Sequence, residues 1–310
     1  MKKYLTTVIA VLLVTAMTAA ACISGEREIL FPEIAAIAAG AFCAPQLAWN
    51  VSLRKMLLLL IAGALTGAAI VLLPIAFPVQ MCLAYLIASL MLLYSRTGFA
   101  PMISAVVLPV MLQSRGMVYP VSAAVLSVTV VLLRVLLERR SMLKPAAYHP
   151  EEKPDAHALH DLAIRWMCGS AVILLAVLSG RNLLAVPPLL VAFTEFWKPS
   201  AKAQQHPVKV SALIGACAGT GALLRYAAMQ TGFPEYLAAC VTITAVLVLM
   251  HKTGMYLPPA AALSVLAYLI PASAVPTYPL LVLCGTLLFL TMAILHGRIT
   301  AFRAGEHAHT

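Results

Sequence analysis

KMLLLLIAGALTG, residues 55–67, aligns with KVSALIGACAGTG, residues 209–221, at an offset of 154. Two shorter matches follow at growing offsets: RTG at 96–98 with KTG at 252–254, and YP at 119–120 with YP at 278–279. The growing offset indicates small insertions inside one duplicated apolar unit. Many membrane transporters are duplicated bundles whose substrate path lies where the halves meet, so we expect this architecture here.

The composition predicts a membrane protein. Of 310 residues, 62% are hydrophobic and 10% are charged, and the mean hydropathy is +0.96. Soluble domains are roughly 45–50% apolar and about 25% charged. A soluble fold of this size has no interior large enough for so much apolar surface, so we predict an all-α, polytopic helix bundle in a lipid bilayer.

Twelve apolar segments divide into two sets of six, which predict two parallel repeats. They are about 4–22, 30–44, 56–74, 79–94, 101–113, 119–137, 163–180, 183–197, 210–228, 234–250, 257–271 and 278–296. The expected domains are a first membrane repeat (1–137), a cytoplasmic polar linker (138–162), a second membrane repeat (163–297) and a cytoplasmic tail (298–310). The linker is the only long polar stretch and contains three prolines, as is typical of exposed connections.

Segments 101–113 and 257–271 are short, because a crossing helix needs about 20 residues. Each begins with proline, which is tolerated in the first helical turn. They either cross or re-enter on the same side. If all twelve cross from a cytoplasmic N-terminus, 17 of the 21 basic residues lie inside; if both short segments re-enter, the split is 10 inside and 11 outside. The positive-inside bias therefore favours twelve crossings in the plasma membrane, with both termini cytoplasmic.

The N-terminus has two interpretations. Lys2-Lys3, an apolar run and Ala19-Ala20-Ala21-Cys22 match a signal peptide with a lipoprotein-like cleavage site. However, residues 10–25 parallel 171–180, and both stretches end in Ser-Gly before a Pro-containing apolar segment. We therefore expect an uncleaved first helix.

Several functional classes receive no support from the sequence. The net charge is +10, but the basic residues sit singly in short loops, which excludes a nucleic-acid-binding face. The seven cysteines form no CxxC pattern or Cys/His cluster, so neither a metal site nor a disulfide framework is predicted. The chain has no nucleophile elbow, HExxH motif or Walker loop, so we predict neither an enzyme nor a cofactor.

The best candidate binding residues precede the two short segments. They are Thr97, Gly98 and Pro101 in the first half, and Thr253, Gly254, Pro258 and Pro259 in the second. Each loop offers a hydroxyl, a flexible glycine and a helix N-terminus, whose partial positive charge and free N–H groups suit an anion. An ordinary turn between helices is the alternative.

Two other pairs are candidates. The repeat-matched Lys55 and Lys209 each begin a helix rich in small residues, where they either anchor the helix in the headgroup region or form a cationic mouth for an anion. Glu33 and Glu195 are acids within the apolar segments, and an ionisable group in hydrocarbon is a functional candidate. Both lie near segment ends, so a place in the headgroup region stays open.

The second half, from about 183 to 297, resembles the HPP family of integral membrane proteins. The resemblance rests on four elements: Pro187-Pro188; His206-Pro207-Val208-Lys209; His251-Lys252-Thr253; and Leu257-Pro258-Pro259-Ala260. Leu257 replaces the histidine of the family's name motif, and the first half keeps only Ala100-Pro101. The resemblance implies a small multi-helix bundle and, for some plastid and cyanobacterial members, a role in nitrite movement across membranes.

We therefore expect a permease for a small anionic or neutral solute, embedded in the lipid bilayer. The alternative is a non-transporting scaffold or accessory protein that acts through its cytoplasmic linker. The sequence leaves open whether copies of the chain associate as a homo-oligomer.

The topology is testable by labelling single cysteines in a background without the seven native ones. Glu152→Cys in the linker should react with an impermeant thiol reagent only after the membrane is opened. Arg181→Cys, in an expected outer loop, should react in intact cells. Labelling of Glu152→Cys in intact cells would contradict the predicted topology.

Overall fold

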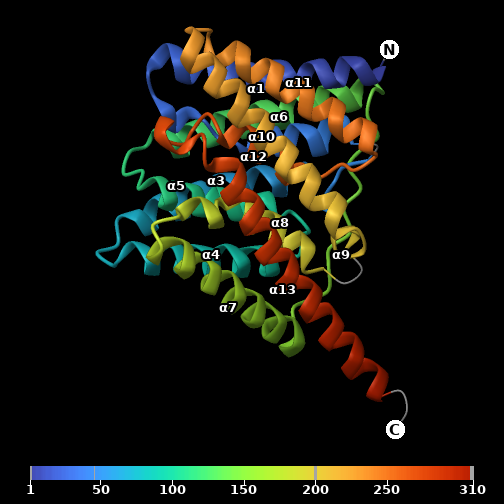
Figure 1. Ribbon diagram of the computed structural model, residues 1–310. Helices are drawn as coiled ribbons and strands as arrows, with labels where there is room; N and C mark the ends of the chain where they lie inside the picture. Colours follow the sequence, from blue (N-terminus) through green and yellow to red (C-terminus); the bar gives the residue numbers. More distant parts are fainter. Residues whose placement is uncertain (1, 45, 199–200, 308–310) are drawn as a thin grey trace.

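The computed structural model describes residues 2–44, 46–198 and 201–307, with the backbone alone for residues 2, 3 and 301–307. Within these ranges the chain is helical and contains no strand (Figure 1). Eight helices are long and apolar enough to cross a membrane. They are α1 (Lys2–Ser24), α3 (Leu53–Val71), α4 (Phe77–Ser95), α6 (Val118–Arg139), α7 (Ala156–Leu178), α10 (Pro207–Thr231), α11 (Glu235–Thr253) and α13 (Tyr278–His307).

The outer faces of the long helices carry large apolar side chains. Leu58, Leu132, Leu178 and Leu223 are each more than 60% exposed. Apolar surface on so many helices is unfavourable in water but favourable in contact with lipid chains. The protein is therefore a multi-pass membrane protein.

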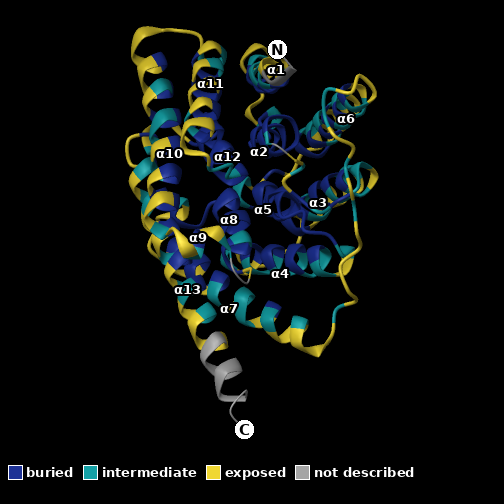
Figure 2. Cartoon of the chain, turned by 90° about the vertical axis from the view of Figure 1, so that its right-hand side faces the viewer, coloured by how far each residue is buried: buried dark blue, intermediate teal, exposed yellow. Residues whose placement is uncertain are grey.

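Four short helical segments fill the centre of the bundle. They are α2 (Glu33–Ala38), continued by the π-helical turn η2 (Ala39–Cys43), α5 (Pro101–Leu112), α8 (Pro187–Phe196) and α12 (Pro258–Leu266). Nearly all of their residues are buried, and Figure 2 shows them as the dark interior between the long helices. Proline begins three of these helices and precedes the fourth at Pro32, which suits a helix that starts abruptly.

Apart from the one-turn helix α9 (Lys202–Gln205) and the 3₁₀ turn η4 (Ala272–Ala274) of the second half, the two halves have the same element order, and they interlock. Each runs long, short, long, long, short, long, with the 3₁₀ turns η1 (Arg27–Ile29) and η3 (Asn182–Ala185) after the first helix. The first long helix of each half packs on the other half, α1 against α11 and α7 against α4. The short helices do the same, α2 against α12 and α8 against α5. The halves therefore bury their central helices against each other.

Two glycines at matching repeat positions bring long and short helices into close contact. A Cβ on Gly67 of α3 would lie 2.2 Å from the Val106 carbonyl oxygen of α5. A Cβ on Gly221 of α10 would lie 2.0 Å from the Ser264 carbonyl oxygen of α12. Only glycine permits this approach, which is how small residues act in membrane helix packing.

Two matched tyrosines hold the same short helices from the opposite side. The hydroxyl of Tyr119 on α6 donates to the Ala105 carbonyl of α5, at 3.3 Å. The hydroxyl of Tyr278 on α13 donates to the Leu263 carbonyl of α12, at 2.5 Å. Both tyrosines are fully buried, so each hydroxyl finds its partner inside the bundle.

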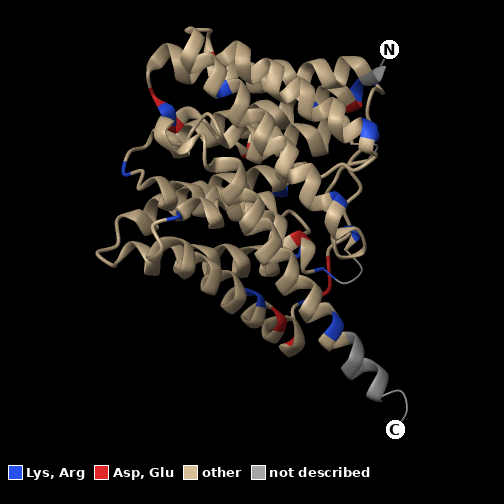
Figure 3. Ribbon diagram, in the orientation of Figure 1, with Lys and Arg blue, Asp and Glu red and all other residues tan. Residues whose placement is uncertain are grey.

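The segment between α6 and α7 runs along one rim of the bundle, which we call the linker rim. Tyr148 contacts Lys55 at the start of α3, His149 contacts Asn50, and Glu151 contacts Arg96 at the end of α4. Most lysines and arginines lie toward this side, where the N-terminus also lies (Figure 3). The opposite rim carries Arg27 and Glu235.

The observed boundaries refine the expected segments. Segments 30–44 and 183–197 are as interrupted as the two singled out for their length. In the first, only 33–43 is helical; in the second, the helix 187–196 follows the separate 3₁₀ turn at 182–185. In the expected linker, the non-helical part spans only 140–155, since α6 ends at Arg139 and α7 begins at Ala156. Helix α13 enters the expected tail and ends at His307, and the last three tail residues lie outside the described residues.

The glycine contact predicts a sharp difference between two neighbouring positions on α10. Gly221→Ala should lower the free energy of unfolding by about 1–3 kcal/mol, because its Cβ meets backbone atoms of α12 that cannot move alone. Gly219→Ala meets nothing within 4 Å, so it should leave stability unchanged or slightly raised. Thermal unfolding of both variants in detergent measures this, and equal stabilities would contradict the packing.

Candidate functional site

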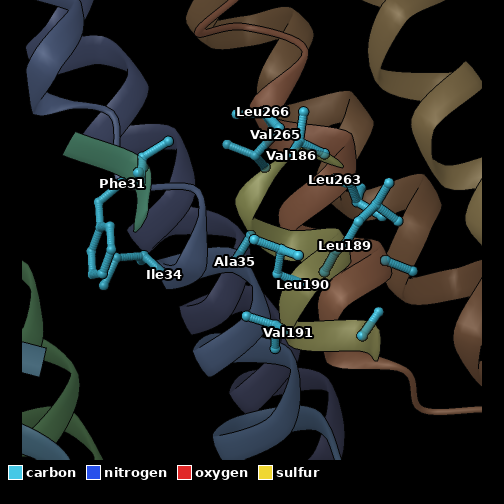
Figure 4. Packing of buried hydrophobic residues seen from close by; sticks show 14 of the residues in the cluster. Phe31, Ile34, Ala35, Val186, Leu189, Leu190, Val191, Leu263, Val265 and Leu266 are labelled. Atoms are coloured by element: carbon cyan, nitrogen blue, oxygen red, sulfur yellow. The ribbon is translucent and has the colours of Figure 1, made fainter. Parts of the chain in front are cut away.

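The site most clearly built from both halves is the centre, where α2, α5, α8 and α12 meet. Figure 4 shows its packed apolar side chains, such as Ile34 from α2, Leu190 from α8 and Leu263 from α12. Apart from half-buried Glu195, all residues of α8 are buried, as are all residues of α2 and α12. The structure therefore captures a closed centre.

One carboxyl group lies in this apolar centre. Glu33, at the start of α2, is 1% exposed, and its Oε1 accepts a hydrogen bond from the Ser104 hydroxyl of α5. Its Oε2 is buried without a hydrogen-bond partner. The sequence leaves open whether Glu33 lies in the headgroup region or within the bundle, and the structure places it in the bundle interior. Glu195 lies half-buried near the linker rim, where it accepts a 3.1 Å hydrogen bond from Trp49 Nε1.

The structure brings Lys55 and Thr97 to one cluster at the linker rim. Lys55 Nζ donates to the Ser95 carbonyl at 2.9 Å and to the Tyr148 hydroxyl at 2.7 Å. The hydroxyls of Ser95 and Thr97 lie 2.7 Å apart. Thr97 is 2% exposed, so the hydroxyl predicted to meet a solute is covered in this state. The Lys55 ammonium group fixes the end of α4 and the linker rather than forming an open mouth.

Gly98 and Pro101 connect this cluster to α5. The Gly98 N–H donates to the Asn50 carbonyl at 3.1 Å, and a Cβ on Gly98 would lie 3.5 Å from both Lys198 Nζ and a Glu151 carboxylate oxygen. Pro101 is buried and opens α5 after this loop. The loop thus lies among charged groups from the linker and from the end of α8.

The matching loop of the second half is more open. Thr253 is exposed, and its hydroxyl donates to the Leu249 carbonyl of its own helix at 2.9 Å. Gly254 ends α11 with a φ of 67°, a left-handed conformation that glycine adopts without strain. Pro258 and Pro259 are buried at the start of α12. Lys209 is exposed on α10, so it shares no cluster with Lys55.

A pocket of about 210 Å³ lies beside this second loop. Elements of both halves line it: α1 and η2 from the first, and the end of α11 with the following loop from the second. Its lining includes Tyr4, Cys43, Leu247, His251 and Tyr256. The His251 Nδ1 and the Tyr256 hydroxyl lie 3.2 Å apart. The pocket thus places polar groups where the two halves meet.

An ion cluster at the opposite rim was not predicted from the sequence. Arg27 of η1 pairs with Glu235 of α11 at 2.6 Å, and this hydrogen-bonded partner raises the pKa of Arg27. Arg225 of α10 is 4% exposed and donates to the carbonyls of Ala267 and Ile270, which end α12. No local sequence pattern links Arg27 with Glu235, because they lie 208 residues apart.

No protein-family model, no curated protein and no solved structure matches the chain.

The geometry predicts different roles for the two repeat-matched lysines. Lys55→Ala should lower the free energy of unfolding by about 1–2 kcal/mol, because two hydrogen bonds from a half-buried ammonium group are lost. Lys209→Ala, on an exposed side chain, should change it by less than about 0.5 kcal/mol. Thermal unfolding in detergent compares them, and an equal loss in both variants would contradict the distinction.

Proposed function

We propose that the protein is a permease for a small anionic or neutral solute, which passes through the centre between its two halves. The observation that carries the proposal is the group of four short, buried helices. At a rise of 1.5 Å per residue, α5, α8 and α12 are only about 14–18 Å long, against a hydrocarbon core of about 30 Å. Interrupted helices at membrane depth are tolerated where protein or a solute path surrounds them, and they build the binding sites of many transporters.

The proposal includes twelve crossing segments in two parallel repeats. It is supported by the element order that the halves share and by the packing of helices of each half on helices of the other. The basic residues at the linker rim support a cytoplasmic linker and cytoplasmic termini in the plasma membrane. Opening would then separate α2 from α12, or α8 from α5, at the contacts that hold the halves together.

The proposed solute entrance is the linker rim. Thr253 and Gly254 are exposed there, next to the pocket formed by both halves, and Lys209 is exposed near the start of α10. Thr97, Gly98 and Lys55 form the matching but covered region of the first half. The cationic groups of this rim would concentrate anions near the entrance. The proposed relationship to the HPP family makes nitrite the first anion to test.

The alternative function, a scaffold acting through the linker, has a different expected behaviour. Residues 144–151 bond to the ends of α3, α4 and α6, which makes this part of the linker a fixed surface of the bundle. A scaffold would copurify with partner proteins and would move no solute. A permease needs no partner for flux in a purified system.

The decisive experiment measures anion flux into proteoliposomes that contain the purified protein. Nitrite, nitrate, chloride and formate are tested in turn against protein-free vesicles, and one of them should enter selectively. The combined variant Thr253→Val, Gly254→Ala, Pro258→Ala should lose that flux while remaining folded in the membrane. Leu287→Ala, on an exposed apolar face of α13, is the matched control and should keep it.

Two results would count against this proposal. Retained flux in the triple variant would remove these residues from the site. Absence of flux for all four anions, with correctly inserted protein, would contradict an anion permease and leave the neutral solutes to be tested.

A further inference from the structure

We propose that Glu33 is a proton-binding site inside the bundle, which holds a proton while the helices are packed as here and exchanges it with water when the contact between α2 and α12 opens. Only the use of this proton to drive a solute rests on the proposed permease function. The protonation and exchange of the carboxyl group stand apart from it.

The first argument is burial without a compensating charge. Glu33 is 1% exposed, and none of the ion pairs among the described residues includes it. An isolated carboxylate in such surroundings costs several kcal/mol, and the group avoids this cost by binding a proton. A neutral carboxyl group is therefore the species that fits this position.

The neighbouring elements supply no cation for Glu33. The helices that pack against α2 are α1, α5, α6 and α12, together with η2. Their described titratable or charged side chains are Tyr4, Cys22, Cys43, Tyr119, Arg134, Glu138 and Arg139. Arg134 is already bound to Glu138 at 2.7 Å and donates to the carbonyls of Ala41 and Lys144. Tyr119 carries no positive charge, and its hydroxyl donates to the Ala105 carbonyl.

The second argument is the hydrogen bonding of the carboxyl group. Ser104 binds one oxygen, while the other is buried without a partner. As a carboxylate, Glu33 would leave most of its acceptor capacity unused in an apolar site. As a carboxylic acid, it accepts the Ser104 hydrogen bond at its carbonyl oxygen and carries the proton on the other oxygen, and a buried neutral hydroxyl without a partner costs far less than a buried charge.

Glu33 also lies beside the contacts between the two halves. It begins α2, which packs on α12 of the second half, and its partner Ser104 lies on α5, which packs on α8. When these contacts open, water reaches the carboxyl group, and the O–H bond breaks as the proton passes to water. On closing, the carboxylate takes a proton from a hydronium ion, and the O–H bond forms again. Each cycle of this kind carries one proton.

The chain contains a matched control for this pair. Glu28 of η1 accepts a hydrogen bond from the Ser114 hydroxyl at 2.6 Å, just after α5, and it is half-buried at the rim. The two pairs share the same chemistry, a serine hydroxyl bound to a glutamate, but of the two glutamates only Glu33 is cut off from water. Glu28→Gln should therefore leave the infrared band of the Glu33 carboxyl group unchanged.

Infrared difference spectroscopy of the purified full-length protein at neutral pH tests the proposal. The wild type should show the C=O band of a protonated carboxyl group, which Glu33→Gln lacks and Glu28→Gln keeps. The band should shift after transfer to D₂O, because the proton exchanges with solvent. If Glu33→Gln leaves the band unchanged, Glu33 is ionised and the proposal is wrong. A band that never shifts in D₂O would overturn the exchange.

A second variant covers the case in which Glu33→Gln does not fold. Ser104→Ala removes the hydrogen bond from the Ser104 hydroxyl to the Glu33 carboxyl group, so the same band should move to higher frequency. An unmoved band would contradict the assignment to Glu33. These spectra need no solute, so a failed flux assay with a confirmed band would remove the permease and keep the proton site. A missing band with intact flux would remove the proton site and keep the permease.

Discussion

The architecture depends on the satisfaction of backbone hydrogen-bonding groups inside the membrane. Short helices have free N–H and C=O groups at both ends, and within a membrane these groups cannot face lipid. Here side chains from the long helices bind backbone carbonyls of α5 and at the C-terminal end of α12. One example is Arg225, which donates to the carbonyls of Ala267 and Ile270. The eight long helices therefore supply hydrogen-bond partners to the four short ones.

The interlocking of the halves follows from the same constraint. A short helix of one half finds its packing surface on the other half, so neither half can bury its centre alone. Gly67 and Gly221 permit the close contact within each half, and the Arg27–Glu235 pair joins the halves at one rim. The bundle therefore has two kinds of contact. Contacts within a half are close and involve backbone atoms, whereas contacts between the halves could open and close when the helices move.

The sequence predicted the parts of the structure that local pattern determines. Hydropathy and the repeat predicted the long helices, and the prolines predicted the abrupt starts of α5 and α12. The interrupted character of α2 was missed because Pro32 and Gly40 are weak signals within an apolar run. The Lys55–Tyr148 and Arg27–Glu235 contacts join residues 93 and 208 positions apart, and no local pattern reports such pairs. The burial of Glu33 depends on how α2 lies against α5, which its sequence neighbours do not determine.

The central claim is that the contact between the halves opens to water. It is tested most directly by the reactivity of Ala35→Cys, in α2, in a chain without native cysteines. Ala35 is fully buried in the closed centre, so its replacement can react with a water-borne thiol reagent only if the centre opens. The account predicts slow but complete labelling in native membranes, faster than unfolding allows. A thiol that reacts only after denaturation would contradict it and would leave a permanently closed bundle.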